Sequence, residues 1–186
     1  MIMRRYLFLL TLLPLAGCGP REPAAPAADA TVKSPLAAPC IECHQQAYDD
    51  WLISDHAHAQ RMVSLDEDAV AFDPARTLAV GSMTTVTRRV EGRLEVETLG
   101  PDGTRQVYQP DMVIGRRPLI QYLIPFDGGR WQTLSVSYDP ASNEWFEVYG
   151  DQDRLPHEWG FWSNRGMNWN VQCAYCHMTN LDKGYD

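Results

Sequence analysis

The stretch Cys173-Ala174-Tyr175-Cys176-His177 repeats the pattern of an earlier stretch, Cys40-Ile41-Glu42-Cys43-His44. In each, two thiols lie three residues apart, so one turn of helix places both on the same side of the chain. Cys-x-x-Cys-His is the attachment signature of c-type haem, in which the thiols form thioethers and the histidine binds iron. We therefore expect two covalent haem c groups, attached at Cys40, Cys43, Cys173 and Cys176, with His44 and His177 as proximal iron ligands.

The cysteine pairs also allow two other interpretations. Two Cys-x-x-Cys knuckles are the ligand set of a structural zinc site. Paired cysteines also form disulfides or thioredoxin-like redox centres. Neither site requires a histidine directly after the second cysteine of each pair, and both pairs have one. The sequence therefore favours haem.

The N-terminus has the features of an export signal. Two arginines fall within the first five residues, and an apolar run over residues 6–14 is too short to span a bilayer comfortably. Leu15-Ala16-Gly17-Cys18 resembles the lipobox of bacterial lipoproteins, in which the signal is cut before the cysteine and the cysteine is lipidated. The resemblance implies a signal peptide over residues 1–17 and a lipid anchor at Cys18. An ordinary secretory signal with an accidental cysteine is the alternative.

Composition and charge limit the partners. The chain has 186 residues and a formal net charge of −8. An acidic surface argues against nucleic acid and suits a basic redox partner protein. Residues 18–39 are dominated by Ala and Pro and predict a tether, which would hold a domain over residues 40–186 away from the membrane. Gly19, where lipoproteins kept at the inner membrane have Asp, favours the outer membrane, with the domain on the periplasmic side.

The chain between the motifs predicts an α+β fold. Apolar residues at helical spacing over residues 45–54 predict a helix packed over the first haem. Residues 84–149 alternate between apolar and polar side chains and predict an antiparallel sheet of roughly five or six strands. The turns are expected at Glu91-Gly92, Gly100-Pro101-Asp102-Gly103, Asp127-Gly128-Gly129 and Asp139-Pro140.

Three histidines outside the motifs are candidates for the second axial ligand of an iron: His56, His58 and His157. His56 and His58 are two residues apart and do not share a helix face, so at most one meets a given iron. Met62 and Met167 are further candidates. Four aromatic residues lie close together just before the second motif and predict either a haem-pocket wall or plain core: Trp159, Phe161, Trp162 and Trp169.

The motifs and their surroundings resemble multihaem c-type cytochromes. The resemblance covers about residues 39–186 and is nearest to bacterial cytochrome c family proteins whose haem domain precedes tetratricopeptide repeats. These are related to the tetrahaem cytochrome that takes electrons from hydroxylamine oxidoreductase. The resemblance depends on both motifs and on Tyr48, Trp51, Ser54, His56, Trp169-Asn170 and Thr179-Asn180-Leu181. Weaker matches are Ile114-Gly115, Gln121-Tyr122-Leu123 and Gly128-Gly129-Arg130.

The resemblance implies a multihaem cytochrome c-like fold, with helical haem-attachment segments flanking an antiparallel sheet. It implies that His56 is a bis-His axial ligand. His157 and Trp159 roughly match a His-Trp pair of the family, although Glu158 stands between them. Relatives continue past Tyr185-Asp186 into further haem motifs, so we expect a shortened dihaem member or a truncated gene product.

The expected function is one-electron transfer, because the sequence has two complete haem motifs and no convincing group of acid/base catalytic residues beside them. We expect an electron-transfer protein more than a catalyst. One alternative is a multihaem oxidoreductase acting on a small nitrogen or oxygen species at a five-coordinate haem. Another is a haem-bearing interaction module.

Overall fold

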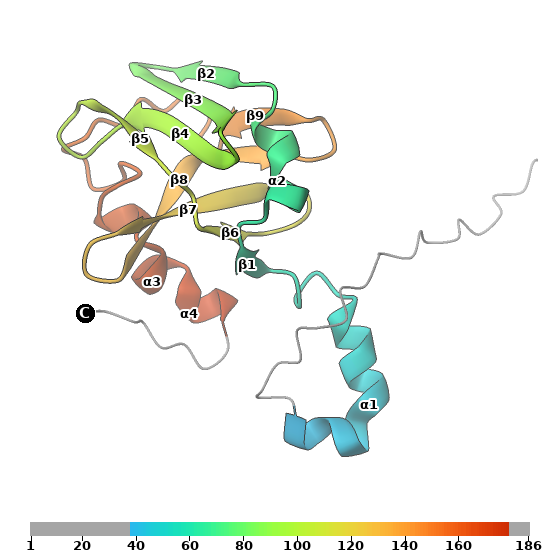
Figure 1. The fold of residues 1–186 in the computed structure, drawn as a ribbon. Helices are drawn as coiled ribbons and strands as arrows, with labels where there is room; N and C mark the ends of the chain where they lie inside the picture. The colour runs from blue at the N-terminus through green and yellow to red at the C-terminus, as the bar shows by residue number, and fades with distance from the viewer. Residues whose placement is uncertain (1–37, 179–186) are drawn as a thin grey trace, which may run out of the picture. The chain divides into compact units, whose positions relative to one another are not determined.

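The structure, a computed structural model, describes residues 38–178. The predicted signal peptide, Cys18 and nearly all of the tether lie outside these residues, as does Thr179-Asn180-Leu181. The elements run in the order α1 (Ala38–Leu52), β1 (Gln60–Met62), α2 (Leu65–Phe72), β2 (Arg76–Val80), β3 (Met83–Val90), β4 (Arg93–Leu99), β5 (Arg105–Tyr108), β6 (Met112–Ile114), β7 (Ile120–Phe126), β8 (Arg130–Asp139), β9 (Glu144–Glu147), a 3-10 helix (Arg165–Met167), α3 (Trp169–Gln172) and α4 (Ala174–His177) (Figure 1).

The strands form two antiparallel sheets. One has five strands in the order β1-β6-β7-β8-β9, and the other has four in the order β2-β3-β4-β5. The prediction of one sheet with five or six strands over residues 84–149 was therefore wrong, since that range contains seven strands, β3 to β9, divided between the two sheets. The missed strands include β1 and β6, which have three residues each and are too short to show an alternating pattern.

The predicted turns join the strands as expected. Glu91 and Gly92 both have positive φ, 49° and 78°, and connect β3 to β4 with Val90 opposite Arg93. Positive φ at both central residues is the pattern of a two-residue type I′ hairpin, which suits the twist of antiparallel strands. The turns at residues 100–103, 127–129 and 139–140 likewise precede β5, β8 and β9.

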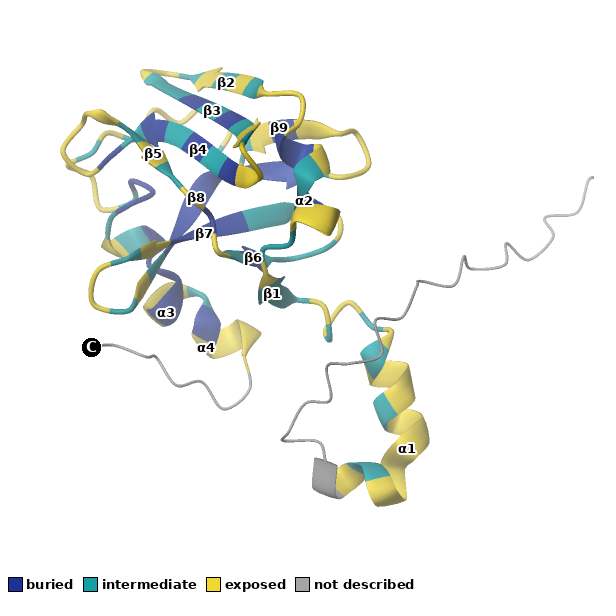
Figure 2. Cartoon of the chain, viewed as in Figure 1, coloured by how far each residue is buried: buried dark blue, intermediate teal, exposed yellow. Residues whose placement is uncertain are grey.

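The main core lies between the two sheets. We call it the inner cluster; it contains Phe72 of α2, Val96 of β4, Tyr122 of β7 and Trp145 of β9, among others. The Phe72 ring meets the Tyr122 and Trp145 rings edge-to-face at centroid distances of 5.1 and 5.4 Å. Edge-to-face aromatic pairs add stability beyond the area that they bury. Figure 2 shows the buried residues concentrated on the facing strands.

The five-stranded sheet is covered on both faces. Tyr122 and Ile124 of β7 belong to the inner cluster, whereas Leu123 between them points to the opposite face, because successive strand residues alternate. There Leu123 packs with Trp169 and Ala174 in a second cluster, which we call the outer cluster. The helices α3 and α4, which carry the second motif, are thereby fixed on the outer face of this sheet.

A buried ion pair attaches β1 and α2 to the sheet. Asp68 of α2 is 1% exposed and accepts two hydrogen bonds from the Arg61 guanidinium, at 2.7 and 2.8 Å. It also accepts the Ser64 N–H at 2.8 Å and the Tyr122 hydroxyl at 3.0 Å. Both carboxylate oxygens are thus fully used, which compensates the cost of burying the charge.

Candidate haem-attachment sites

The first motif occupies the start of α1. The backbone departs from helical geometry at His44, with φ −127° and ψ 37°, so the helix is kinked directly after the second cysteine. The second half is held by Gln45, which donates to Asp49 at 2.7 Å, and by Gln46, which donates to Asp50 at 3.0 Å. A helix following the motif is therefore confirmed, although it ends at Leu52 rather than Ser54.

The side chains around the first motif are open to solvent. Cys40, Cys43 and His44 are exposed, and none of residues 40–52 is buried. The Tyr48 and Trp51 rings lie 5.8 Å apart on the second half of the helix, and Trp51 is 39% exposed. Thiols, imidazole and apolar rings are thus all accessible along one short helix. These residues fit a porphyrin attached at Cys40 and Cys43.

The second motif is built at the junction of α3 and α4. The Cys173 N–H donates to the Trp169 carbonyl at 3.1 Å, and the N–H groups of Cys176 and His177 both donate to the Cys173 carbonyl at 3.2 Å. One turn of helix therefore brings the two thiols and the imidazole together. Cys176 and His177 are exposed.

Among the cysteines and histidines of the two motifs, Cys173 alone is partly buried. It packs against the outer cluster of Leu123, Trp169 and Ala174. Burial raises the pKa of the Cys173 thiol, with a further rise from Cys176 and an opposing effect of the Thr133 hydroxyl. The second motif thus has one half-buried thiol and one exposed thiol, whereas both thiols of the first motif are exposed.

The four motif cysteines are also the residues on which the zinc and disulfide interpretations depend. Cys40, Cys43, Cys173 and Cys176 are all free thiols. Within residues 38–178, no three His, Cys, Asp or Glu side chains form a group that could hold a metal ion. A zinc site requires four such ligands around one point, whereas haem iron takes only axial ligands from the chain. The donor set of each motif, two thiols followed directly by one imidazole, fits haem attachment.

The candidates for the second axial ligand lie in different environments. His56 is exposed and follows α1 in a turn, where its carbonyl accepts the Ala59 N–H at 3.3 Å. The His58 ring nitrogen lies 3.0 Å from the Leu52 carbonyl and is engaged there. Met62 is 57% exposed on β1. Met167 is 5% exposed and its sulfur accepts the Tyr149 hydroxyl at 3.1 Å, so it is not available.

His157 lies on a different layer from the second motif. It follows Pro156, which lies near Gly103 in the turn between β4 and β5 of the four-stranded sheet. His177 ends α4, which packs on the outer face of the five-stranded sheet. The structure does not bring His157 and His177 together. The roles of His56 and His157 as second axial ligands stay predictions.

The aromatic residues before the second motif divide between core and site. Phe161 and Trp162 belong to the inner cluster, and the Trp162 indole donates to the Leu99 carbonyl at 2.7 Å. Trp159 is 65% exposed. Only Trp169 packs beside the second motif. Sequence reasoning missed the partners that β6 and β8 supply, Met112, Ile114 and Trp131, although apolar residues at consecutive positions signal a strand covered on both faces.

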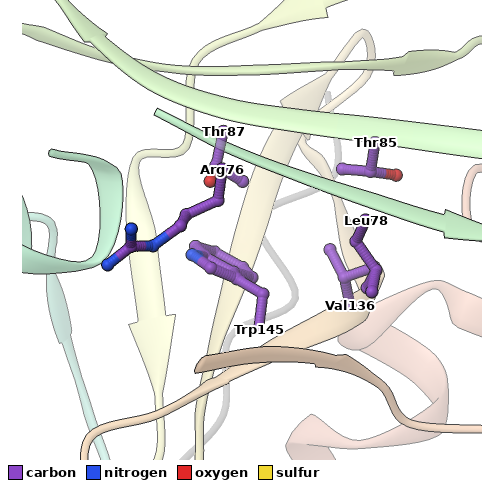
Figure 3. Close-up of a pocket in the computed structure, with 6 residues that line it drawn as sticks. All are labelled: Arg76, Leu78, Thr85, Thr87, Val136 and Trp145. Atoms are coloured by element: carbon purple, nitrogen blue, oxygen red, sulfur yellow. The ribbon is translucent and has the colours of Figure 1, made fainter. Parts of the chain in front are cut away.

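The space between the sheets is not a haem site. A small pocket there is lined by Arg76, Leu78, Thr85, Thr87, Val136 and Trp145 (Figure 3). Its volume is about 10 Å³, and a cavity of this size holds at most one water molecule. This pocket is therefore too small for a porphyrin.

None of the helices within residues 38–178 is long and apolar enough to cross a membrane.

Part of the chain matches a known protein family. Residues 39–91 match the family described as cytochrome c554 and c-prime. The matched segment contains the first motif and His56 and runs to the turn after β3. No curated protein and no solved structure matches the chain. The family match supports a c-type cytochrome that carries covalently bound haem c and iron and takes part in electron transfer.

Proposed function

We propose that the chain is an exported, lipid-anchored dihaem c-type cytochrome that carries out one-electron transfer. The observation that carries the proposal is the presence of two complete Cys-x-x-Cys-His motifs, each on a helix with its histidine exposed. The fold that goes with it is multihaem cytochrome c-like, with helical attachment segments on either side of the β structure in sequence.

In this proposal the motif cysteines attach the haems and the histidines bind iron. Cys40 and Cys43 hold one haem and Cys173 and Cys176 the other, while His44 and His177 supply the proximal imidazoles. When bound, each haem supplies an iron that accepts and releases one electron. The chain sets the second axial ligand, for which we propose His56 at one site, and the polarity around each iron. His157 is the weaker candidate, because Pro156 before it lies at the four-stranded sheet.

Most of the described titratable groups with shifted pKa values lie in the two sheets rather than at the motifs. Apart from Cys173, the groups with shifted pKa values belong to the two sheets, their flanking segments and their turns. Burial raises the pKa of Tyr122, as does Asp68 beside it. The Thr104 N–H lowers the pKa of Asp102, and the Ala141 N–H that of Asp139. These shifts follow from folding contacts within the sheets and their turns.

The electron-transfer role is tested by spectroelectrochemical titration of the purified full chain. We expect each haem to take up one electron and both to be low-spin, with spectra unchanged by cyanide or nitric oxide. A high-spin haem that binds either ligand would contradict the carrier and support the oxidoreductase. Electron exchange with a basic partner protein should slow as ionic strength rises, given the net charge of −8.

The lipid anchor is tested separately. Cys18→Ala removes the thiol that the lipobox resemblance assigns to acylation. We expect the variant to leave the membrane fraction while keeping its haem spectrum, because the motifs are untouched. Retention of the variant in the outer-membrane fraction would contradict the anchor and leave the cytochrome proposal intact.

A further inference from the structure

We propose that the second haem packs against the outer face of the five-stranded sheet, with the indole N–H of Trp169 as its polar contact. This inference rests on the proposed function, because it requires a haem attached at Cys173 and Cys176. It names the surface that surrounds that haem, which the family match over residues 39–91 does not reach.

Cys173 places the attachment point of the second haem at the outer cluster. Its thiol is half-buried in the outer cluster, beside Leu123 and Trp169. A thioether at this sulfur joins one edge of the porphyrin directly to it. That edge therefore lies at the margin of the outer cluster. Cys176 and His177 are exposed, so the remainder of the attachment is open to the incoming group.

The outer face of the sheet continues as an apolar surface beyond the two short helices. Met112 and Ile114 of β6 and Trp131 of β8 are partly buried against the outer cluster. Met112 lies opposite Leu123 on one side and opposite Met62 of the edge strand β1 on the other. Met62 is 57% exposed. Paired residues of neighbouring strands share a face, so this surface extends from the second motif to β1.

The outer face of the four-stranded sheet has the opposite character. There Arg88 pairs with Glu95 at 3.0 Å and with Glu97 at 2.6 Å, and Arg105 pairs with Glu97 at 3.0 Å. An antiparallel sheet with one solvated face normally shows such polar side chains on it. The five-stranded sheet has Met112, Ile114 and Trp131 on its outer face, with Gln60 and Gln121 on either side of Ile114. The apolar residues give a surface against which a porphyrin can pack.

Trp169 adds a polar contact at the same place. It is 3% exposed, and its indole nitrogen is buried with no hydrogen-bond partner in the described part of the chain. The other two buried indoles are both satisfied: Trp145 donates to the Ala71 carbonyl at 2.6 Å and Trp162 to the Leu99 carbonyl at 2.7 Å. A buried donor without an acceptor is costly. Haem carries two carboxylates, which are acceptors of the required kind.

The first test uses the full chain with Cys40→Ala and Cys43→Ala, so that only the second haem is attached. We expect the methyl resonances of Met112 and Ile114 to shift between the ferric and ferrous forms, whereas that of Val107, 49% exposed on the four-stranded sheet, stays in place. Unshifted Met112 and Ile114 methyls would overturn the inference.

The second test compares two indole variants in that same chain. Trp169→Phe removes the indole N–H that has no partner in the described part of the chain. It should change the pH dependence of the midpoint potential, because a haem carboxylate loses its hydrogen-bond donor. Trp162→Phe removes a donor engaged by Leu99, so it should lower the unfolding temperature and leave the potential unchanged. A Trp169→Phe potential equal to that of the parent chain at every pH would overturn the polar contact.

The haem content of the same samples distinguishes a failure of the placement on the sheet from a failure of the proposed function. A chain with one covalent haem and unshifted Met112 and Ile114 methyls contradicts only the placement on the sheet. A chain with no haem at Cys173 and Cys176 contradicts the proposed function together with it.

Discussion

Replacing Asp68 by Asn tests whether the buried ion pair holds β1 and α2 on the five-stranded sheet. Asp68 is 1% exposed and accepts four hydrogen bonds, two from Arg61 and one each from the Ser64 N–H and the Tyr122 hydroxyl. The amide has the same shape but no charge, and its NH2 group must face two of these donors, because each carboxylate oxygen accepts two. The substitution therefore leaves the Arg61 charge without its main partner.

The expected loss follows from the surroundings of Arg61. Breaking a buried ion pair by removing one partner costs about 3–5 kcal/mol. The Arg61 side chain is 24% exposed and keeps a second carboxylate, Glu67, at 2.9 Å. Water and Glu67 compensate part of the lost interaction, so we place Asp68→Asn at the lower end of the range, about 3 kcal/mol less stable to unfolding.

Equilibrium urea unfolding followed by far-UV circular dichroism measures this loss. Asp55→Asn is the matched control, because Asp55 pairs with Arg117 at 3.0 Å but both side chains are more than half exposed. An exposed pair is worth at most about 1 kcal/mol. If Asp68→Asn unfolds with the same free energy as Asp55→Asn, the assignment of a structural role to the buried pair is wrong.

Two further substitutions probe the sheets. Burial raises the pKa of Glu147, so the folded state binds its proton more tightly than the unfolded chain and stability falls as pH rises from about 4.5 through the raised pKa. Glu147→Gln should remove that fall in urea titrations at several pH values; an unchanged pH profile would contradict it. Gly115 has φ +81°, and an added methyl would come within 2.5 Å of the Leu119 carbonyl oxygen. Gly115→Ala should therefore lose more stability than Gly92→Ala, which has φ +78° but open space around it, and equal losses would contradict the steric argument.

Local sequence signals predicted the parts of the fold that depend on a few neighbouring residues. The Glu91-Gly92 turn was predictable because Gly92 adopts positive φ without steric cost, although Glu91 has positive φ as well. The helix after the first motif was predictable because its apolar residues recur at helical spacing. The helix α2 was missed, since its eight residues span little more than two turns. The split into two sheets was missed because strand pairing is decided by tertiary contacts that no local pattern records.

The candidate sites were likewise predictable only where a local sequence pattern defines them. Cys173, Cys176 and His177 were identified by spacing alone, which is a covalent requirement of the cofactor. The different roles of Trp162 and Trp169 were not predictable, because two tryptophans seven residues apart lie on opposite faces of one sheet. The placement of His157 also depends on which sheet its loop follows, and sequence spacing carries no information about that.

The haem content of the purified chain tests the central claim most directly. A pyridine haemochrome assay, with mass spectrometry of the intact chain, should give two covalent haems for the parent protein. Each double variant, Cys40→Ala/Cys43→Ala and Cys173→Ala/Cys176→Ala, should retain one. A parent chain without covalent haem, or one whose cysteines hold zinc instead, would contradict the account.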